Sequence, residues 1–424
     1  MPVCIICAVD FLGGASMIER NKGFANLSAG YLFPEVAKRR RDYQAAHPDA
    51  QIISLGVGNT TEPLTPHITQ AMEDYVRGLG TVEGYSGYGD DYGLSELREK
   101  IAAVLYPGMA SPDEIFISDG AKCDIARIQT LFGPGTSIAV QDPAYPVYVD
   151  GSVIVGATGK ARSQGGYDGV TYMPCTAENK FFPDLSVVKP GTLIYFCSPN
   201  NPTGVASTKE QLKKLVDFAN ENGCIIIYDA AYYAFIRDQK LPRTIYEIPD
   251  AQKCAIEINS FSKLAGFTGV RLGWSVVPSK LAFADGTSVR QDWCRVMATL
   301  FNGASSIAQR GGLAALDSKG IAETTALVDY YLENAALIRK ALTAQNFAAA
   351  GVTVYYTGDS PYLWVYFPGW KSWDIFDKIL DECRVVTTPG SGFGPAGEGY
   401  LRFSSFGHRK DVEEACVRLS KLGL

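Results

Sequence analysis

Histidine is scarce in this sequence, because the 424 residues include only His47, His67 and His408. So few histidines argue against a histidine-rich metal site or a Ser-His-Asp triad. Basic charge is also lacking, since the formal net charge is −6. This balance offers no basic face for nucleic acid or for an anionic membrane. No segment approaches about 18 uninterrupted apolar residues, so we expect no membrane span.

Cysteines are more numerous but are not arranged as a metal or redox site. Most of the ten stand among apolar or small residues, as reduced and buried cysteines do. The one tight pair, Cys4-x-x-Cys7, has no second pair beside it, so a zinc or redox site is not expected. It lies in residues 1–19, which we interpret as a disordered tail or a processing remnant.

The stretch 257–275 carries the clearest candidate for a functional site, because one lysine stands there among small residues. Lys263 follows Ser260 and Ser262 and precedes a glycine-rich run that leads to Arg271. Hydroxyl groups and a guanidinium fork are the donors that a phosphate group prefers. A lone lysine on a glycine-rich loop is usually a surface residue, but here each neighbour suits a phosphate. The pattern therefore predicts a lysine that forms a Schiff base with pyridoxal phosphate.

A strand–helix–strand unit precedes the lysine and fixes where functional groups should gather. The apolar run 193–197 predicts a buried strand, a helix follows with a capping box formed by Ser207 and Glu210, and 225–228 predicts the next strand. Such a unit is a right-handed parallel crossover, and ligands bind outside the carboxyl ends of its strands. Asn201, Asp229 and Lys263 all fall at that edge.

An anion site is predicted further upstream, where the expected strand 114–118 is followed by a glycine turn and a helix. The free backbone N–H groups at the start of that helix would meet a phosphate at Ala121 and Lys122. Asp229 would keep the pyridine nitrogen of the cofactor protonated, and Tyr232 with Asn201 would hydrogen-bond the ring oxygen O3′. Tyr145 would provide a flat stacking wall.

From about residue 310 the pattern changes to a helix over 321–345, strands at 352–355, 363–367, 385–387 and 400–404, and a helix over 372–382. Gly392 to Gly397 matches G-x-G-x-x-G, but Pro395 interrupts it and no helix follows, so a dinucleotide site is not expected.

The domain organisation that we predict is a tail at 1–19, an N-terminal arm with part of the small domain at 20–55, a large domain at 56–309 and a small domain at 310–424.

The Lys263 stretch resembles the cofactor-lysine segment of fold-type I aminotransferases. Longer phrases are similar to the LL-diaminopimelate aminotransferase family, namely SDGAKCD at 118–124, SFSKLAGFTGVRLGW at 260–274, FNGAS at 301–305, VVTTPGSGFGP at 385–395 and FGHR at 406–409. The resemblance implies an α/β fold with a mostly parallel central sheet between helices, plus a smaller α+β domain. It also implies a homodimer with shared active sites.

The same resemblance implies transfer of an amino group between LL-2,6-diaminopimelate and 2-oxoglutarate, giving tetrahydrodipicolinate and L-glutamate, in lysine biosynthesis. The implied catalytic residues are Lys263, Asp229 and Tyr232. The implied substrate contacts are Tyr31, Gly56, Tyr88, Asp91, Lys122, Tyr145, Asn201, Asn302 and Arg402. Tyr88 and Asn302 would also reach the cofactor from the partner subunit, and Arg402 would grip the α-carboxylate.

One departure from the family concerns the Gly/Tyr-rich loop at 80–93. The family commonly places a Glu there for the distal ammonium group, whereas this chain has Asp91, which is one methylene shorter. The alternatives are an aminotransferase for another amino acid, a lyase on the same scaffold, or a cofactor-binding regulator. The last would need an added DNA-binding helix-turn-helix domain, and no basic stretch in these residues is long enough to form one, so we do not expect it. The expected compartment is the chloroplast stroma in a plant or alga, and otherwise the cytoplasm.

Overall fold

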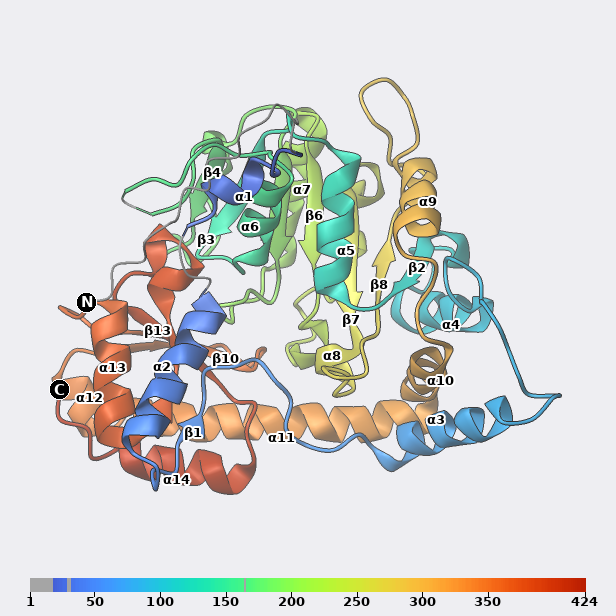
Figure 1. Cartoon of the computed structure of the whole chain (residues 1–424). Coiled ribbons are helices and arrows are strands. Elements are labelled where there is room, and N and C mark those ends of the chain that lie inside the picture. The colour runs from blue at the N-terminus through green and yellow to red at the C-terminus, as the bar shows by residue number, and fades with distance from the viewer. Residues whose placement is uncertain (1–17, 29–31, 164) are drawn as a thin grey trace, which may run out of the picture.

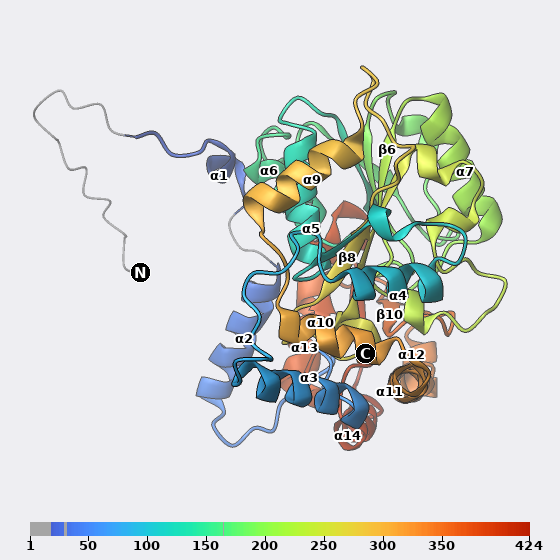
Figure 2. The same cartoon turned by 90° about the vertical axis from the view of Figure 1, so that its right-hand side faces the viewer.

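The computed structural model describes residues 18–28, 32–163 and 165–424. Its larger part is a seven-stranded sheet with helices on both faces, and its smaller part joins an antiparallel sheet to segments from both ends of the chain (Figures 1 and 2). The predicted tail and the Cys4–Cys7 pair fall outside the described residues, except for residues 18 and 19. No helix within the described ranges is long and apolar enough to cross a membrane.

The large sheet has the strand order β2-β8-β7-β6-β5-β3-β4. Strands β4, β3, β5, β6 and β7 run parallel, while β8 is antiparallel to both β7 and β2. Its strands are β2 Ile115–Ser118, β3 Ile138–Asp142, β4 Val170–Pro174, β5 Leu193–Cys197, β6 Ile225–Asp229, β7 Ala255–Ser260 and β8 Gly273–Val276. The continuous apolar strands are explained by burial on both faces. The α/β class predicted from the sequence is confirmed.

Helices cover this sheet on its two faces and join its strands. They are α1 Gly23–Asn26, α3 Pro66–Leu79, α4 Ser95–Leu105, α5 Ala121–Ile128, α6 Val147–Ile154, α7 Lys209–Glu221, α8 Phe261–Leu264, α9 Val289–Leu300 and α10 Ser306–Ala315. The α7 crossover is as predicted, but its capping box is one residue later than predicted. Thr208 and Gln211 form the box rather than Ser207 and Glu210. The N–H of Ser207 instead donates to Ser198 Oγ at 2.9 Å.

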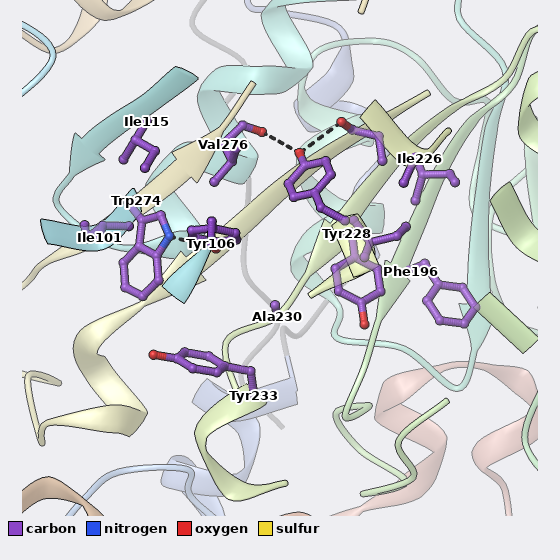
Figure 3. Close-up of a cluster of buried hydrophobic side chains, with 14 of the residues drawn as sticks. Ile101, Tyr106, Ile115, Phe196, Ile226, Tyr228, Ala230, Tyr233, Trp274 and Val276 are labelled. Carbon is purple, nitrogen blue, oxygen red and sulfur yellow. Dashed lines mark hydrogen bonds between the residues drawn. The ribbon is translucent and has the colours of Figure 1, made fainter. Parts of the chain in front are cut away.

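Two hydrophobic clusters fill the space between the large sheet and its helices. Figure 3 shows part of the first cluster, with Trp274 beside Tyr106 and Tyr228 beside Phe196. The indole N–H of Trp274 donates to the Tyr106 hydroxyl at 3.0 Å, so the cluster also satisfies its polar atoms. This packing holds the lysine-bearing strand β7 and its neighbours in a fixed position.

The smaller part contains the sheet β12-β13-β10-β9, which is antiparallel throughout. A short parallel pair joins β1 to β11, so residues from the N-terminal arm lie with the C-terminal region. The elements are α2 Leu32–Ala46, β1 Ile53–Ser54, β9 Thr353–Tyr355, β10 Tyr362–Tyr366, α12 Gln345–Ala349, α13 Ser372–Cys383, β11 Val385–Val386, β12 Thr388–Pro389, β13 Tyr400–Ser404 and α14 Arg409–Leu419. Short 3-10 turns occupy the G-x-G-x-x-G stretch, and β13 follows them.

Helix α11, Ser318–Leu342, runs beneath both parts and is the long orange helix at the bottom of Figure 1. Leu327 and Tyr331 on its first half pack into the core of the large part, whereas Ile338 and Leu342 on its second half pack into the core of the small part. The helix begins three residues earlier than predicted, because Asp317 caps it by accepting from the N–H of Gly320. The predicted domain limits stay a prediction.

Candidate active site

A cavity of about 700 Å³ lies at the carboxyl ends of β5 and β6, between the large sheet and the small part. This is the edge at which the strand–helix–strand pattern predicted a ligand. The predicted site residues that line it are Ala121, Lys122, Tyr145, Asn201, Asp229, Tyr232, Ser260, Ser262, Lys263, Arg271 and Arg402. The structure therefore brings together residues from β6, the β7–α8 segment, the start of α5 and β13.

Four other predicted residues that the structure describes do not line this cavity. The carbonyl of Gly56 lies behind the cavity wall, where it accepts from Arg402 Nη2 at 2.6 Å. Tyr88 is 94% exposed on the connection after α3, which extends away from the body at the right of Figure 1. Asp91 is half-buried in the same connection, and Asn302 is exposed in the turn after α9. Tyr31 falls outside the described residues.

The segments that carry Asp91 and Asn302 adjoin each other, although they are far apart in the sequence. A Cβ placed on Gly303 would lie 3.2 Å from the carbonyl oxygen of Asp90. Asp90 is engaged locally, because its Oδ1 accepts from the N–H of Tyr92 at 2.8 Å and its Oδ2 lies 3.8 Å from Arg98. Of the two neighbouring carboxylates, Asp91 forms no such hydrogen bond or ion pair with any described residue.

Lys263 stands on α8, the single helical turn that follows β7. Its amine donates to the carbonyl of Gly58 and lies 5.0 Å from the ring centre of Phe406. Burial lowers the pKa of this amine to about 7, and the positive charges of Arg402 and Arg271 add to the effect. A large fraction of the amine is thus neutral near pH 7, which is the form that attacks an aldehyde.

Asp229 ends β6 at the base of the cavity. Its Oδ2 accepts from the Tyr148 hydroxyl at 2.7 Å, and its Oδ1 accepts from the N–H of Ala231 at 3.0 Å. Burial raises the pKa of this carboxyl, and no lysine or arginine within the described residues forms an ion pair with it. A cationic ring nitrogen would supply the missing partner, so the site fits a protonated pyridine.

Tyr148 was missed by the sequence interpretation, although one signal was available. It follows Tyr145 by three residues, across the turn that leads into α6. The two rings meet edge to face with their centres 5.7 Å apart. The Tyr-x-x-Tyr spacing could therefore have indicated that the second tyrosine supports the first beside the cofactor ring.

The predicted phosphate site lies where β2 meets α5. Gly120 precedes the helix with φ of 120°, and a Cβ there would lie 2.3 Å from Arg271 Nη2, so only glycine allows the guanidinium to approach. The first N–H groups of α5 have no partner within the helix. Arg271 Nη1 donates to Ser262 Oγ at 3.2 Å. Together these donors form a cradle that fits a phosphate.

Arg402 is almost completely buried, with 1% of its surface exposed. Its Nη1 donates to Asn201 Oδ1 and its Nη2 to the carbonyl of Gly56, each at 2.6 Å, while its Nε has no partner. Throughout the described ranges no carboxylate pairs with Arg402 or with Arg271. A buried guanidinium without an anion is costly, so both arginines fit sites that receive anionic groups from a ligand.

Tyr232 and Asn201, the two residues predicted to contact O3′, lie close to each other in the lining of the cavity. Asn201 Nδ2 lies 3.5 Å from the Tyr232 hydroxyl. A residue missed from the sequence, Tyr362 on β10, places its hydroxyl 2.9 Å from the same oxygen. No local motif marked Tyr362, because only the approach of the small sheet to the cavity brings it there.

The arrangement suits a flat, phosphorylated ring whose aldehyde reaches a lysine. Tyr145 forms one side wall, and the amine of Lys122 lies 5.7 Å from the centre of its ring. The cradle would hold the phosphate end, Asp229 would meet the ring nitrogen and Lys263 would meet the reactive end. Arg402 would then be left to bind the carboxylate of a second ligand beside the cofactor. These positions support amino-group transfer on pyridoxal phosphate.

Comparisons with known proteins agree with this geometry. Residues 50–419 match the family described as aminotransferase class I and II. The chain is 50% identical over 421 residues, which is 99% of this chain and 90% of the relative, to the chloroplastic LL-diaminopimelate aminotransferase of Arabidopsis thaliana. It is also 50% identical over 404 residues, 95% of this chain and 97% of the relative, to LL-diaminopimelate aminotransferase of Protochlamydia amoebophila.

A solved structure gives the same result. L,L-diaminopimelate aminotransferase from Chlamydomonas reinhardtii superposes with a TM-score of 0.90 and 54% identity, over 96% of this chain and 98% of that one. A substrate-bound structure of BacF from a Bacillus is more distant, with a TM-score of 0.80 and 26% identity over 96% and 98% of the two chains. The similarity covers both parts of the fold and all the elements that form the cavity.

Proposed function

This chain belongs to the class I and II aminotransferase family, and from that membership we propose that it transfers an amino group between LL-2,6-diaminopimelate and 2-oxoglutarate, giving tetrahydrodipicolinate and L-glutamate. This reaction is a step of lysine biosynthesis. The observation that carries the proposal is the convergence of Lys263, Asp229 and Arg402 on one cavity, in a chain half identical to enzymes named for this reaction. The cofactor is pyridoxal phosphate.

Bound pyridoxal phosphate supplies an electron-accepting ring that stabilises negative charge at the substrate Cα. The chain supplies the groups that hold the ring and move protons. With the cofactor bound, the Lys263 amine would hold its aldehyde and, when free, would take the proton from the substrate Cα as general base. Its lowered pKa suits that task, because a general base works best with a pKa near the operating pH. Asp229 keeps the ring nitrogen protonated.

Orientation of the substrate rests on Arg402. A guanidinium binds a carboxylate through two parallel hydrogen bonds, which fixes both position and angle. Nη1 and Nη2 are already held by Asn201 and Gly56, so the guanidinium is preorganised before a ligand arrives. The Cα–H bond of the bound amino acid can then be aimed at Lys263, which lowers the entropic cost of the proton transfer.

A homodimer with shared active sites is part of the proposal. Tyr88 and Asn302 would extend from one subunit toward the cofactor and substrate of the other, and Asp91 would meet the distal ammonium group there. The exposure of Tyr88 and Asn302, and the position of all three residues outside the cavity of their own subunit, support this assignment. Tyr31 and Gly56 would complete the substrate pocket. The compartment would be the chloroplast stroma in a plant or alga and the cytoplasm in a bacterium, since relatives of both kinds match.

The proposal is tested by measuring glutamate formed from 2-oxoglutarate by the purified protein. LL-diaminopimelate, meso-diaminopimelate, lysine and aspartate are supplied as donors in parallel. We expect strong turnover with the LL isomer. Turnover with a different donor alone would retain the aminotransferase and contradict the substrate. Absence of glutamate with the cofactor band present would contradict the transfer reaction and favour lyase chemistry.

A further inference from the structure

Tyr362 is a cavity residue whose hydroxyl and ring face two different functional groups. It lies on β10 and is 1% exposed. Its hydroxyl oxygen is 2.9 Å from the hydroxyl oxygen of Tyr232, and the face of its ring lies 4.3 Å from the guanidinium carbon of Arg402. It therefore stands between the residue assigned to the cofactor O3′ and the residue assigned to the substrate carboxylate.

The direction of the hydrogen bond follows from what Tyr232 must do. If the Tyr232 hydroxyl donates its only proton to the cofactor O3′, its oxygen can only accept from its other neighbours. Tyr362 then has to be the donor in the pair of hydroxyls. Asn201 Nδ2, at 3.5 Å, lies at the limit of hydrogen bonding and is a weaker donor to the same oxygen. A donor behind a hydroxyl polarises it and strengthens the bond that it makes in front.

The ring of Tyr362 has a separate contact. Phe393 faces the same guanidinium with its ring centre 4.9 Å from the Arg402 carbon. Flat aromatic rings attract a guanidinium and restrict its rotation. The remaining space around the hydroxyl is also closed, because a Cβ on Gly58 would lie 2.3 Å from it. Tyr362 is thus held in one position between its two partners.

We propose that Tyr362 is a positioning residue with two separable actions, in which its hydroxyl polarises Tyr232 toward the cofactor O3′ and its ring fixes Arg402 for the substrate carboxylate. The proposal rests on the proposed function for the identity of the cofactor. It does not depend on which amino acid is the donor. Its hydroxyl is bonded to Tyr232 and its ring faces Arg402, so it acts through these two side chains.

The hydroxyl action is tested with Tyr362→Phe in the cofactor-loaded protein. The readout is the apparent pKa seen in the absorbance of the lysine-bound cofactor as pH is varied, which needs no substrate. A weaker bond to O3′ destabilises the deprotonated form, so the apparent pKa rises. Ten to thirty per cent cooperative weakening of a charged hydrogen bond corresponds to about 0.1 to 0.7 of a pH unit. Tyr228→Phe is the matched control, because Tyr228 is also a buried tyrosine but lies in the cluster of Figure 3, outside the cavity.

A double-mutant cycle separates this action from a general structural effect. In a Tyr232→Phe background, Tyr362→Phe should leave the apparent pKa unchanged, because the bond it supports is gone. A shift in Tyr362→Phe equal to that in Tyr228→Phe would overturn the hydroxyl action. The same would follow if the shift persisted in the Tyr232→Phe background.

The ring action is tested by the affinity for 2-oxoglutarate, measured calorimetrically. Tyr362→Phe keeps the ring and should bind within about threefold of wild type, whereas Tyr362→Leu should bind about tenfold more weakly, as expected for a desolvated cation–π contact. Equal affinity in Tyr362→Leu and Tyr362→Phe would overturn the ring action. If Tyr362→Leu does not fold, Tyr362→Met replaces it with the same expectation. If the pKa and affinity changes are observed but the protein does not turn over diaminopimelate, the result contradicts the proposed function and leaves the role of Tyr362 standing.

Discussion

Lys263 gives a prediction about stability in the cofactor-free protein that follows from its burial. Its amine has a pKa of about 7 in the folded chain against the usual 10.5. The unfolded chain therefore binds the proton more tightly, and the folded state loses stability as pH falls from about 10.5 toward 7. Below about 7 the amine is protonated in both states, so the loss stops growing. At 1.36 kcal/mol per pH unit the full loss is at most about 5 kcal/mol.

Replacement of the amine by an isosteric apolar side chain removes this pH dependence. The quantity of interest is the free energy of unfolding of Lys263→Met minus that of wild type. We expect this difference to rise as pH is lowered from about 10 to about 7 and to be constant below that range. The assay is urea denaturation of the cofactor-free proteins at a series of pH values. Lys240→Met is the control, because Lys240 is exposed in the loop after the β6 segment. The reasoning is refuted if the difference between Lys263→Met and wild type does not change with pH, or changes as it does for Lys240→Met.

Three further predictions concern turnover. Arg402→Lys keeps the charge but loses the fork, so the affinity for 2-oxoglutarate should fall by about ten- to a hundredfold while the cofactor stays bound, and an unchanged KM would place the carboxylate elsewhere. Asp91→Ala should raise the KM for LL-diaminopimelate by about tenfold and leave that for glutamate within about twofold; equal effects on both would remove Asp91 from recognition of the distal amine. Tyr148→Phe removes the hydroxyl donor of Asp229 and should lower kcat by about tenfold with little change in KM, which steady-state kinetics at saturating cofactor would check. A change confined to KM would contradict that role.

Local patterns predicted the parts of this fold that depend on local chemistry. Strands β5 and β6 were predicted within a residue, because a sheet buried on both faces leaves a continuous apolar run. The start of α5 was predicted for a similar reason, since a strand, a glycine and a helix are adjacent in the sequence. Lys263, Asp229 and Arg271 carry their signals in their immediate neighbours, and the structure places all three in one cavity.

What sequence reasoning missed depends on contacts between distant segments. Ser207 with Glu210 and Thr208 with Gln211 have the same spacing, so the pattern alone could not choose between two capping boxes. The hydroxyl of Ser198 decides between them. It accepts a hydrogen bond from the N–H of Ser207, and the capping box forms at Thr208 instead. No local sequence pattern marked Tyr362, because its place in the site also depends on contacts between distant segments. It enters the site only because the β10–β13 pair places it beside Arg402.

The charges around the cavity explain why a second subunit should complete the substrate pocket. Among the described residues that line it, Lys122, Lys263, Arg271 and Arg402 are basic, and Asp229 is the one acidic side chain. This excess suits a phosphate and two carboxylates. A diamino dicarboxylic acid also brings a distal ammonium group, and Asp229 is already committed to the base of the site. In the proposed dimer, the carboxylate for that ammonium would come from outside this wall, and Asp91, in the segment that adjoins Gly303, would be the residue that supplies it.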